Sequence, residues 1–391
     1  MSELSVFEMP RVRRVVQGAG ARGELAGELD AAGLGRVLLL SGKTVGASPE
    51  FAALREQLGP RLAGVFTGVE AHNPVERVVE TIERARESGA EAIAAVGGGS
   101  PIDAAKLAAL GVVEGVASTD ELASFALQFE YPSTVRAREL ERTPLPVFAI
   151  PTTLSAAEWD GFAGSVDHAR DTKDLTRYLE LTPEVVLLDP ELCASTPRDL
   201  WAQTGVRALD HAVETAYARN AHPYTSALAA GALELLAANL PRSAADPGDY
   251  EAALSCQIAA WMSIIGVHNV SLGLSHAIGH QLGALGIPHG VTSCIMLPHV
   301  MRFLEPVTGD QQRAMAAALA RAQGSETPGP AADHVEVLLT ELGVPRRVSD
   351  YGIPREKMEG VATASLADLV VRESPRKVDE AVIYELLEQV W

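Results

Sequence analysis

The chain has 391 residues, which is more than one hydrophobic core usually holds, so two domains are expected. Hydrophobic residues make up 47% and charged residues 21% of the sequence, a balance that predicts a globular fold and excludes a disordered chain. The net charge of −19 argues against nucleic acid or an anionic membrane surface as the main partner.

The sequence shows no targeting or membrane-spanning pattern. No apolar run follows a basic start at the N-terminus, and no stretch of about 18 uncharged apolar residues occurs. Cys193, Cys256 and Cys294 are odd in number and far apart, which fits neither a disulfide framework nor a zinc site and favours free thiols. We therefore expect a cytoplasmic protein without a membrane span.

Short β-rich runs alternate with helical stretches through the first part of the chain. Apolar runs predict buried strands at 36–42, 62–69, 91–97, 145–153 and 183–190. Helical patterns lie between them at 49–58, 73–89 and 101–113. This alternation predicts an α/β domain, built on a doubly wound parallel sheet, over residues 1–190.

The character of the sequence changes after about residue 190. Alanine- and leucine-rich helical patterns cover 198–218, 223–239, 249–271, 273–285, 310–322 and 378–390. Strand patterns almost disappear in this part of the chain. We therefore predict an all-α domain over residues 191–391.

A glycine-rich loop joins the strand that ends near residue 97 to the next helix. Glycine has no Cβ, so its backbone can approach a pyrophosphate closely, and the following helix N-terminus favours an anion. Asp103 in the first helical turn is expected either to cap the helix or to contact the cofactor, and Lys106 could reach the phosphate side. The residues predicted to meet the phosphates are Gly98, Gly99 and Ser100.

The segment GGGSPIDAAK (97–106) resembles the nucleotide-binding signature of iron-containing alcohol dehydrogenases. Further segments resemble that family in chain order: VVQGAGARGEL (15–25), FTGVEAHNP (66–74), IPTTLSAAEWD (150–160), LLDPELCASTP (187–197) and SHAIGHQLGALGIPHG (275–290). The resemblance implies the two-domain architecture shared with dehydroquinate synthase, a nicotinamide cofactor, a small-molecule substrate and a homodimer. It also implies cofactor contacts from Asn73, Thr152, Thr153 and Ser155.

The end of the first predicted strand bears on the choice of dinucleotide. In such folds an acidic residue after that strand binds the 2′-hydroxyl of the adenine ribose. Here the sequence reads Ser41, Gly42, Lys43, with no carboxylate, and the Ser41 hydroxyl and Lys43 could hold a 2′-phosphate. This favours NADPH over NADH, although Lys43 also reads as an ordinary solvated loop lysine.

Four histidines form the second candidate site. His276 and His280 are four residues apart on a predicted helix and should share a face, while His289 follows a turn and His211 lies on an earlier helix. The family resemblance implies that His211, His276 and His289 match metal ligands. It places His280 beside the nicotinamide and the substrate.

One position departs from the family pattern. The family has an aspartate ligand four residues before the first histidine, and here that residue is Arg207. A guanidinium cannot ligate a cation and would repel one, so a divalent metal is doubtful. Maleylacetate reductases are relatives that also lack this aspartate and work without metal.

The predicted function is NAD(P)H-dependent reduction of a carbonyl or enoate, including anionic, maleylacetate-like substrates, without a catalytic metal. Arg207 would stabilise an oxyanion or a substrate carboxylate, and His211, His276 or His280 would supply a proton. Alternatively, Arg207 forms a structural salt bridge with a nearby carboxylate such as Asp210 or Glu214. A metal-dependent alcohol dehydrogenase, and a redox-inactive relative acting as a lyase or cyclase, are the other functions that the sequence leaves open.

Overall fold

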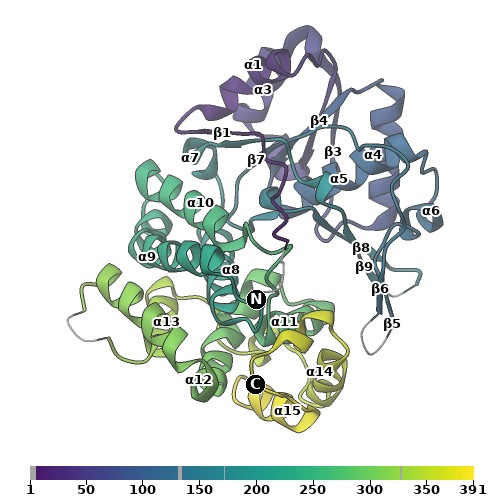
Figure 1. Ribbon diagram of the computed structural model, residues 1–391. Helices are drawn as coiled ribbons and strands as arrows, with labels where there is room; N and C mark the ends of the chain where they lie inside the picture. The colour runs from purple at the N-terminus through teal and green to yellow at the C-terminus, as the bar shows by residue number, and fades with distance from the viewer. Residues whose placement is uncertain (1–5, 131–133, 171, 326–327) are drawn as a thin grey trace. The chain divides into compact units, whose positions relative to one another are not determined.

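The computed structural model describes residues 6–130, 134–170, 172–325 and 328–391 (Figure 1). The chain divides into two compact units. The first unit spans Pro10–Ser195 and contains the parallel sheet. The second unit spans Thr196–Trp391, together with the N-terminal residues as far as Met9, and is helical.

The first unit is built on a six-stranded sheet in which every neighbouring pair is parallel. In spatial order the strands are β1 (Arg14–Gln17), β10 (Val185–Leu188), β7 (Val147–Pro151), β4 (Ala92–Gly97), β2 (Val37–Gly42) and β3 (Leu62–Val69). The five strands predicted from apolar runs are confirmed. The edge strand β1 was not predicted, because its four residues are exposed or half-buried and give no apolar run.

Helices cover both faces of this sheet, as a doubly wound fold requires. Val37 and Leu39 of β2 face a core shared with α1 (Leu25–Ala31) and α3 (Pro49–Leu58). The alternate residues Leu38 and Leu40 point to the opposite face, where α4 (Val75–Glu87) and α5 (Gly99–Glu114) pack. The α/β fold class predicted from the sequence is confirmed.

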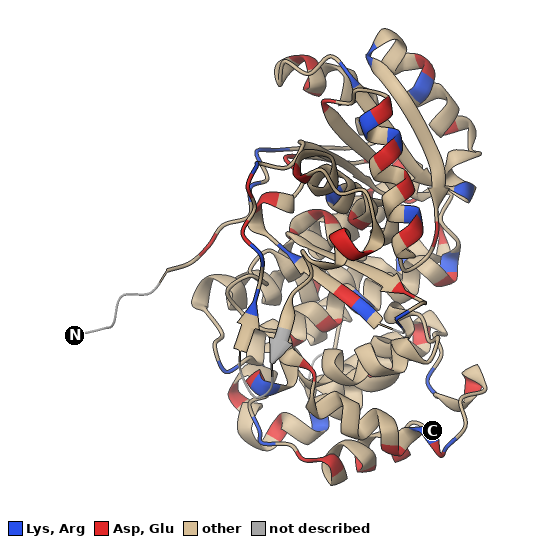
Figure 2. Cartoon of the chain, turned by 90° about the vertical axis from the view of Figure 1, so that its right-hand side faces the viewer, with Lys and Arg blue, Asp and Glu red and all other residues tan. Residues whose placement is uncertain are grey.

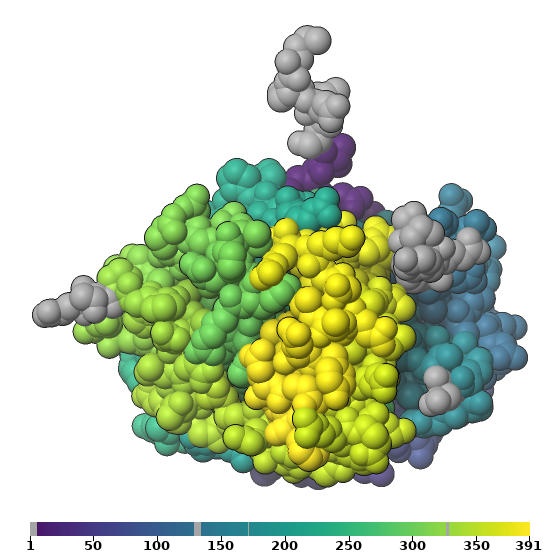
Figure 3. All heavy atoms as spheres, turned by 90° about the horizontal axis from the view of Figure 1, so that it is seen from below, coloured from purple at the N-terminus to yellow at the C-terminus, as the bar shows by residue number. Residues whose placement is uncertain are grey.

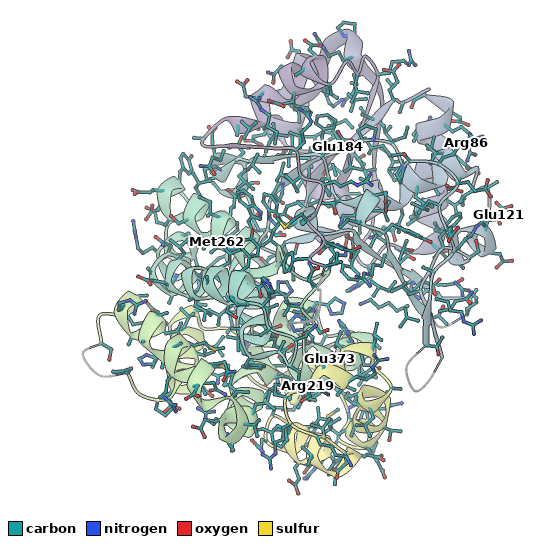
Figure 4. The ribbon with its side chains drawn as sticks, viewed as in Figure 1. Arg86, Glu121, Glu184, Arg219, Met262 and Glu373 are labelled. Atoms are coloured by element: carbon teal, nitrogen blue, oxygen red, sulfur yellow. The ribbon has the colours of Figure 1, made fainter. Side chains whose placement is uncertain are left out.

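The position of α5 is fixed by its contacts with α4. A Cβ at Gly111 of α5 would lie 2.4 Å from Ile82 Cδ1 of α4, so a larger residue at this position would force the Ile82 side chain or the helix to shift. Arg86, labelled in Figure 4, donates from Nη2 to the backbone oxygen of Val116 at 2.8 Å, just beyond the end of α5. These contacts hold α5 with its N-terminus at the carboxyl ends of the strands.

Shorter elements connect these helices and strands. An antiparallel hairpin, β8 (Phe162–Asp167) and β9 (Thr172–Arg177), follows β7 and packs against α4 and α5. The others are η1 (Ala21–Glu24), α2 (Lys43–Gly46), η2 (Gly59–Arg61), α6 (Thr119–Ala123), β5 (Gln128–Glu130), β6 (Thr134–Arg136), η3 (Ala157–Trp159), η4 (Leu179–Leu181) and α7 (Pro190–Cys193).

The described residues of the second unit form no strand after Thr196. Its elements are α8 (Arg198–Tyr217), α9 (Pro223–Ala245), α10 (Tyr250–Ile264), α11 (Leu274–Ala284), α12 (His289–Ala322), α13 (Ala331–Leu342), η5 (Ser349–Tyr351), α14 (Lys357–Leu366), η6 (Leu369–Glu373) and α15 (Glu380–Glu388). Helix α8 packs against α9, α10 and α12. The C-terminal residues, yellow in Figure 3, form a continuous surface around α14 and α15.

Helix α12 is longer than the predicted segment 310–322, since it already begins at His289. It contains Pro298 and Pro306, and Thr308 has non-helical backbone angles (φ −125°, ψ 18°) that mark a kink. Proline removes a backbone donor and disturbs a helical pattern, which is why the first half of α12 was missed.

Charged residues of both signs are interspersed along the helices on the side that Figure 2 shows. That side has no continuous basic face of the kind that nucleic-acid binding requires. Among the described residues, no helix combines the length and the apolar character needed to cross a membrane.

Candidate functional site

The residues predicted to bind the dinucleotide lie at or just after the carboxyl ends of four parallel strands, at the same end of the sheet. From β2 the chain adds β3 on one side, and it then adds β4, β7 and β10 in turn on the other side of β2. The direction in which strands are added therefore reverses between β2 and β4. Doubly wound folds bind ligands at such a switch point. Ser41 and Gly42 are the last residues of β2 and Lys43 begins α2, Asn73 follows β3, Gly98, Gly99, Ser100 and Asp103 follow β4, and Thr152, Thr153 and Ser155 follow β7.

The glycine loop after β4 packs closely against the loop after β7. A Cβ at Gly98 would lie 3.1 Å from Thr153 Cγ2, and a Cβ at Gly99 would lie 3.1 Å from Ser155 Oγ. The Thr153 hydroxyl donates to Ser155 Oγ at 3.2 Å. No side chain caps the N-terminus of α5 at Gly98. The first N–H groups of the helix can therefore donate to a phosphate bound at the glycine loop.

The two residues expected to meet a 2′-phosphate differ in exposure. Ser41 is fully buried, and its hydroxyl donates to the backbone oxygen of Val96 at 2.8 Å. That position is at odds with a direct contact between the Ser41 hydroxyl and a phosphate. Lys43 is exposed at the first residue of α2, so recognition of a 2′-phosphate would depend on Lys43.

Asn73 and Asp103 both hold the β8–β9 hairpin. Asn73 has a left-handed backbone (φ 53°) and donates from Nδ2 to the oxygen of Gly164 at 3.1 Å. The Gly164 N–H donates to Asp103 Oδ2, also at 3.1 Å. Burial raises the pKa of Asp103 to about 6, although Lys106 opposes the shift. Asp103 does not cap α5, because the N-cap residue is Gly98. Ser100, in the first turn of the same helix, accepts the N–H of His72 at its Oγ atom, at 3.3 Å.

The expectation that Lys106 reaches the phosphates is wrong. Its side chain is fully buried, and Nζ lies 3.0 Å from Asp160 Oδ1 and 2.7 Å from the oxygen of Phe162. Lys106 is held on the hairpin side of α5 by Asp160 and by the start of β8, which bury its ammonium group.

The four predicted histidines form a row within the helical unit. The rings of His211 and His276 stack with centroids 5.0 Å apart. His276 and His280 lie 6.4 Å apart and His280 and His289 lie 6.2 Å apart, both edge to face. The shared helical face predicted for His276 and His280 is confirmed.

Glu214 is a member of this site that the sequence suggested only as a possible ion-pair partner of Arg207. His276 Nδ1 lies 2.7 Å from Glu214 Oε2, and both side chains are fully buried. Glu214 also accepts the N–H groups of Gly273, Ser275 and His276 at the start of α11, at 2.7, 2.8 and 3.3 Å. The Glu214 carboxyl group therefore fixes both the helix N-terminus and the orientation of the His276 ring.

Arg207, Asp210 and Glu214 lie at positions i, i+3 and i+7 of α8 and so share one helical face. Asp210 Oδ2 accepts the Ser275 hydroxyl at 2.8 Å, and both residues are buried. A run of charged residues on one face of an otherwise apolar helix is the sequence signal that could have identified this network.

The Arg207 guanidinium extends from α8 to α11 and α12. Its Nη1 donates to Ser293 Oγ of α12 at 3.2 Å, and a Cβ at Gly279 of α11 would lie 3.7 Å from the same atom. Burial lowers the pKa of Arg207, while Asp210 and Glu214 raise it through space. Because an arginine keeps its proton at any working pH, this site holds a permanent cation.

The histidines beside Arg207 are held neutral. Burial lowers the pKa of His211 and of His276 well below the ordinary histidine value, and the Arg207 charge lowers both further. Burial also raises the pKa of Asp210 to about 6 and that of Glu214 to about 8. Arg207 is therefore the strongest positive centre in the histidine row.

These residues do not fit the divalent metal that the family pattern implies. Among the described residues, His276 Nε2 and His211 Nδ1 are buried without a hydrogen-bond partner, as ligand atoms would be. Yet the sequence resemblance assigns to Arg207 the position at which the family has its carboxylate ligand. Ligand atoms of Asp210, Glu214 and His276 lie within 4.8 Å of one another, but Glu214 already accepts backbone N–H groups and the His276 ring.

Comparison with known proteins follows the same division of the chain. The model for "Iron-containing alcohol dehydrogenase" matches residues 12–190, and the model for "Fe-containing alcohol dehydrogenase family, C-terminal" matches residues 201–391. Lactaldehyde reductase of Escherichia coli strain K12 is 31% identical to the chain, over 96% of this chain and 97% of the relative. Maleylacetate reductase of Rhizobium sp. strain MTP-10005 is 29% identical, over 97% and 95%.

A solved structure agrees over the whole length. The crystal structure of maleylacetate reductase from Agrobacterium tumefaciens superposes with a TM-score of 0.82 at 25% identity, covering 100% of this chain and 99% of the other. Both family models, these relatives and the shared fold point to the same chemistry. The chain therefore belongs to the iron-containing alcohol dehydrogenase family, and it is an NAD(P)-dependent dehydrogenase or reductase.

Proposed function

We propose that the protein reduces the carbonyl or enoate group of an anionic small molecule with NAD(P)H and without a catalytic metal. The observation that carries this proposal is the half-buried Arg207 guanidinium, which stands where the family resemblance implies a carboxylate ligand and acts electrostatically on His211 and His276. A fixed cation attracts a substrate carboxylate or a developing oxyanion.

The substrate class follows from this charge. A simple alcohol or aldehyde would leave the guanidinium without an anionic partner at the reacting group, whereas a keto acid or an unsaturated acid supplies one. Two relatives at 29% and 25% identity are maleylacetate reductases, which act on a compound of that kind. Maleylacetate is therefore the first substrate to test.

In the reaction, hydride passes from C4 of the reduced nicotinamide to the electrophilic carbon. For a carbonyl substrate, the C=O electron pair moves to oxygen, Arg207 stabilises the negative charge, and an imidazolium donates the proton. For an enoate, the same proton goes to the α-carbon. We assign the proton to His280, because His211 and His276 are buried and neutral while the His280 side chain is 32% exposed.

For the cofactor we propose that the pyrophosphate binds the first turn of α5 beside Gly98, Gly99 and Ser100. Support comes from the uncapped helix N-terminus and from the close packing of Thr153 and Ser155 on the glycine loop. We propose NADPH as the preferred dinucleotide, since Lys43 is exposed after β2 and no carboxylate follows that strand.

One observation favours a second candidate, a metal-dependent alcohol dehydrogenase. Within the described part of the chain, His276 Nε2 and His211 Nδ1 have no hydrogen-bond partner. A cation bound by these nitrogens would satisfy both atoms, but it would have to overcome the repulsion of Arg207.

Metal analysis and chelation distinguish the two candidates. We expect protein purified without chelator to contain far less than one transition metal ion per chain. Reduction of maleylacetate with NADPH should then survive dialysis against EDTA. One zinc or iron ion per chain, lost together with activity, would instead establish the metal-dependent alternative.

The role of Arg207 is tested by substitution. We expect Arg207→Ala to lower kcat/KM for maleylacetate by about 10²-fold or more, as loss of an oxyanion donor usually does. The matched control is Arg198→Ala, which removes an exposed arginine at the first residue of the same helix. Equal, small effects of both substitutions would remove Arg207 from the mechanism.

A further inference from the structure

A carboxylate outside the predicted site pairs with the histidine assigned as proton donor. His280 Nδ1 of α11 lies 2.9 Å from Oδ2 of Asp368, the residue just before η6. The same oxygen accepts Gln281 Nε2 at 3.3 Å, and Oδ1 accepts the N–H of Val370 at 3.1 Å. Both oxygens of Asp368 are therefore engaged, and the carboxylate has one fixed orientation.

Asp368 is ionised at neutral pH. Burial raises its pKa, but the hydrogen bond and the charge interaction with His280, with the Val370 N–H and Gln281, outweigh that effect and bring the pKa below the ordinary value. An anionic acceptor 2.9 Å away requires the proton of the neutral ring on Nδ1 of His280. The Nε2 atom is then the one that exchanges a proton with a substrate.

His276 and His280 each have an acidic partner at Nδ1, but the two pairs differ in their exposure to solvent. His276 also meets a carboxylate, Glu214, through Nδ1, but both side chains are fully buried. His280 is 32% exposed and Asp368 is 11% exposed. Among these described pairs, the His280–Asp368 pair is therefore the one whose outer ring nitrogen can reach a bound molecule.

The position of Asp368 is set by a distant part of the unit. Helix α11 packs against η6 and α14, which flank Asp368. Arg219, which follows α8, donates from Nη1 to the backbone oxygen of Arg372 in η6 at 3.4 Å. Arg219 and Glu373 lie in the same part of the helical unit in Figure 4. The segment around η6 thus places the Asp368 carboxylate beside His280.

We propose that Asp368 is a positioning residue that holds His280 with its proton on Nδ1 and directs Nε2 to the substrate. The inference rests on the proposed function of His280. During carbonyl reduction the protonated ring gives its Nε2 proton to the substrate oxygen while Nδ1–H stays bonded to Asp368. The neutral ring then takes a new proton from water before the next turnover.

The first test reads the ring directly and needs no substrate. In protein labelled with ¹⁵N at its 10 histidines, His280 is assigned by the loss of its signals in His280→Gln. We expect the neutral wild-type ring to carry its proton on Nδ1, and Asp368→Asn to give a mixture of tautomers. A wild-type ring protonated mainly on Nε2 would overturn the proposal, whatever the enzyme reduces.

The second test separates positioning from folding. Asp368→Asn should lower kcat for maleylacetate at least about tenfold, while KM and NADPH affinity change less than about twofold, because general acid catalysis contributes about 10²–10⁴-fold. Asp368→Glu, which keeps the carboxylate, should recover part of the loss. Asp379→Asn is the matched control, since exposed Asp379 caps α15 through Val382 but meets no histidine.

The outcomes distinguish this inference from the proposed function. If His280→Gln abolishes turnover but Asp368→Asn leaves kcat unchanged, His280 remains the proton donor and the role of Asp368 is refuted. If His280→Gln has no effect, the proposed function fails at His280, and the tautomer measurement alone decides whether Asp368 orients the ring.

Discussion

At the end of β2, two neighbouring polar residues have different environments. Ser41 is buried and its hydroxyl donates to a backbone oxygen of β4, whereas Lys43 is exposed at the start of α2. A lysine ammonium is a compact charge, so its interaction with a phosphate is much stronger than its hydrogen bond to a neutral ribose hydroxyl. Discrimination between the two dinucleotides should therefore depend on one side chain.

Replacing Lys43 with alanine should weaken NADPH binding about ten- to hundredfold and leave NADH binding nearly unchanged, because a charge-assisted contact is worth about 1.5–3 kcal/mol. Fluorescence titration of both cofactors measures this ratio. Lys357→Ala is a suitable control, since Lys357 is also exposed at the first residue of a helix. Equal losses for both cofactors would mean that Lys43 does not contact the 2′-phosphate.

Glu158 is buried beside Trp159 in η3. Its side chain is 1% exposed, and in the described structure Oε2 has no hydrogen-bond partner. Burial raises the pKa of Glu158 from 4.5 to about 8. A carboxyl whose folded-state pKa is raised stabilises the fold fully below the unfolded pKa, and this stabilisation is lost as pH rises through the folded pKa.

Glu158→Gln should therefore reduce the loss of thermal stability between pH 5 and pH 9. The neutral amide has no proton to lose, so the difference in Tm between the two pH values should shrink by at least about 2 °C relative to the wild type. Differential scanning calorimetry at both pH values measures it. An equal shift at both pH values would show that packing, and not ionisation, explains the change.

Spacing along the chain predicted the histidines and the glycine loop, but not their partners. Glu214 lies 62 residues before His276, and Asp368 lies 88 residues after His280. Periodicity reports only which residues share a face of one element, so a contact between elements leaves no local signal. The misplaced Lys106 has the same cause, since the packing of the neighbouring hairpin decides whether a helical lysine is exposed.

At the scale of elements, a buried ion pair joins α5 to the start of the β8–β9 hairpin. Lys106 is fully buried, and its Nζ lies 3.0 Å from Asp160 Oδ1. Asp103 Oδ1 lies further from the same Nζ, at 3.7 Å. Removing Asp160 leaves the buried lysine charge with only this more distant carboxylate, which costs more free energy than the pair itself contributes. The hairpin also meets Asn73 and Asp103 near the glycine loop, so this pair supports the cofactor site.

Asp160→Asn should lower the free energy of unfolding of the α/β unit by about 3 kcal/mol. Urea unfolding followed by the combined fluorescence of the four tryptophans, one of which is the neighbouring Trp159, measures the loss. The double variant Lys106→Met with Asp160→Asn should recover part of it, because the uncompensated charge is gone. Asp30→Asn, in an exposed pair with Arg61, is the control and should have little effect.

The elements predicted best were those whose burial is uniform along the segment. Strands β2, β4, β7 and β10 are buried at nearly every residue, so their apolar runs were plain. The hairpin strand β9 (TKDLTR) is mostly exposed and polar, and it forms because β8 pairs with it. Tertiary pairing of this kind overrides local preference, which is why such a strand cannot be read from its own residues.

At the scale of the whole molecule, the net charge of −19 opposes the ligands that the site is proposed to bind. NADPH and a carboxylate substrate are both anions, and local attraction comes from Lys43, Arg207 and the N-terminus of α5. Long-range repulsion reaches about 30 Å at 0.01 M salt and about 8 Å at 0.15 M. Salt should therefore weaken the repulsion more than the short-range contacts.

The rate constant for NADPH association, measured by stopped-flow fluorescence, should accordingly rise as salt increases between these two concentrations. Screening removes the repulsion that the incoming ligand meets at long range, whereas a basic protein would show the opposite slope. NADH provides the control, since it lacks the 2′-phosphate and should show a shallower increase. A rate constant that falls with salt would mean that the positive groups near the glycine loop dominate the field along the approach, and that the acidic residues lie too far away to oppose it.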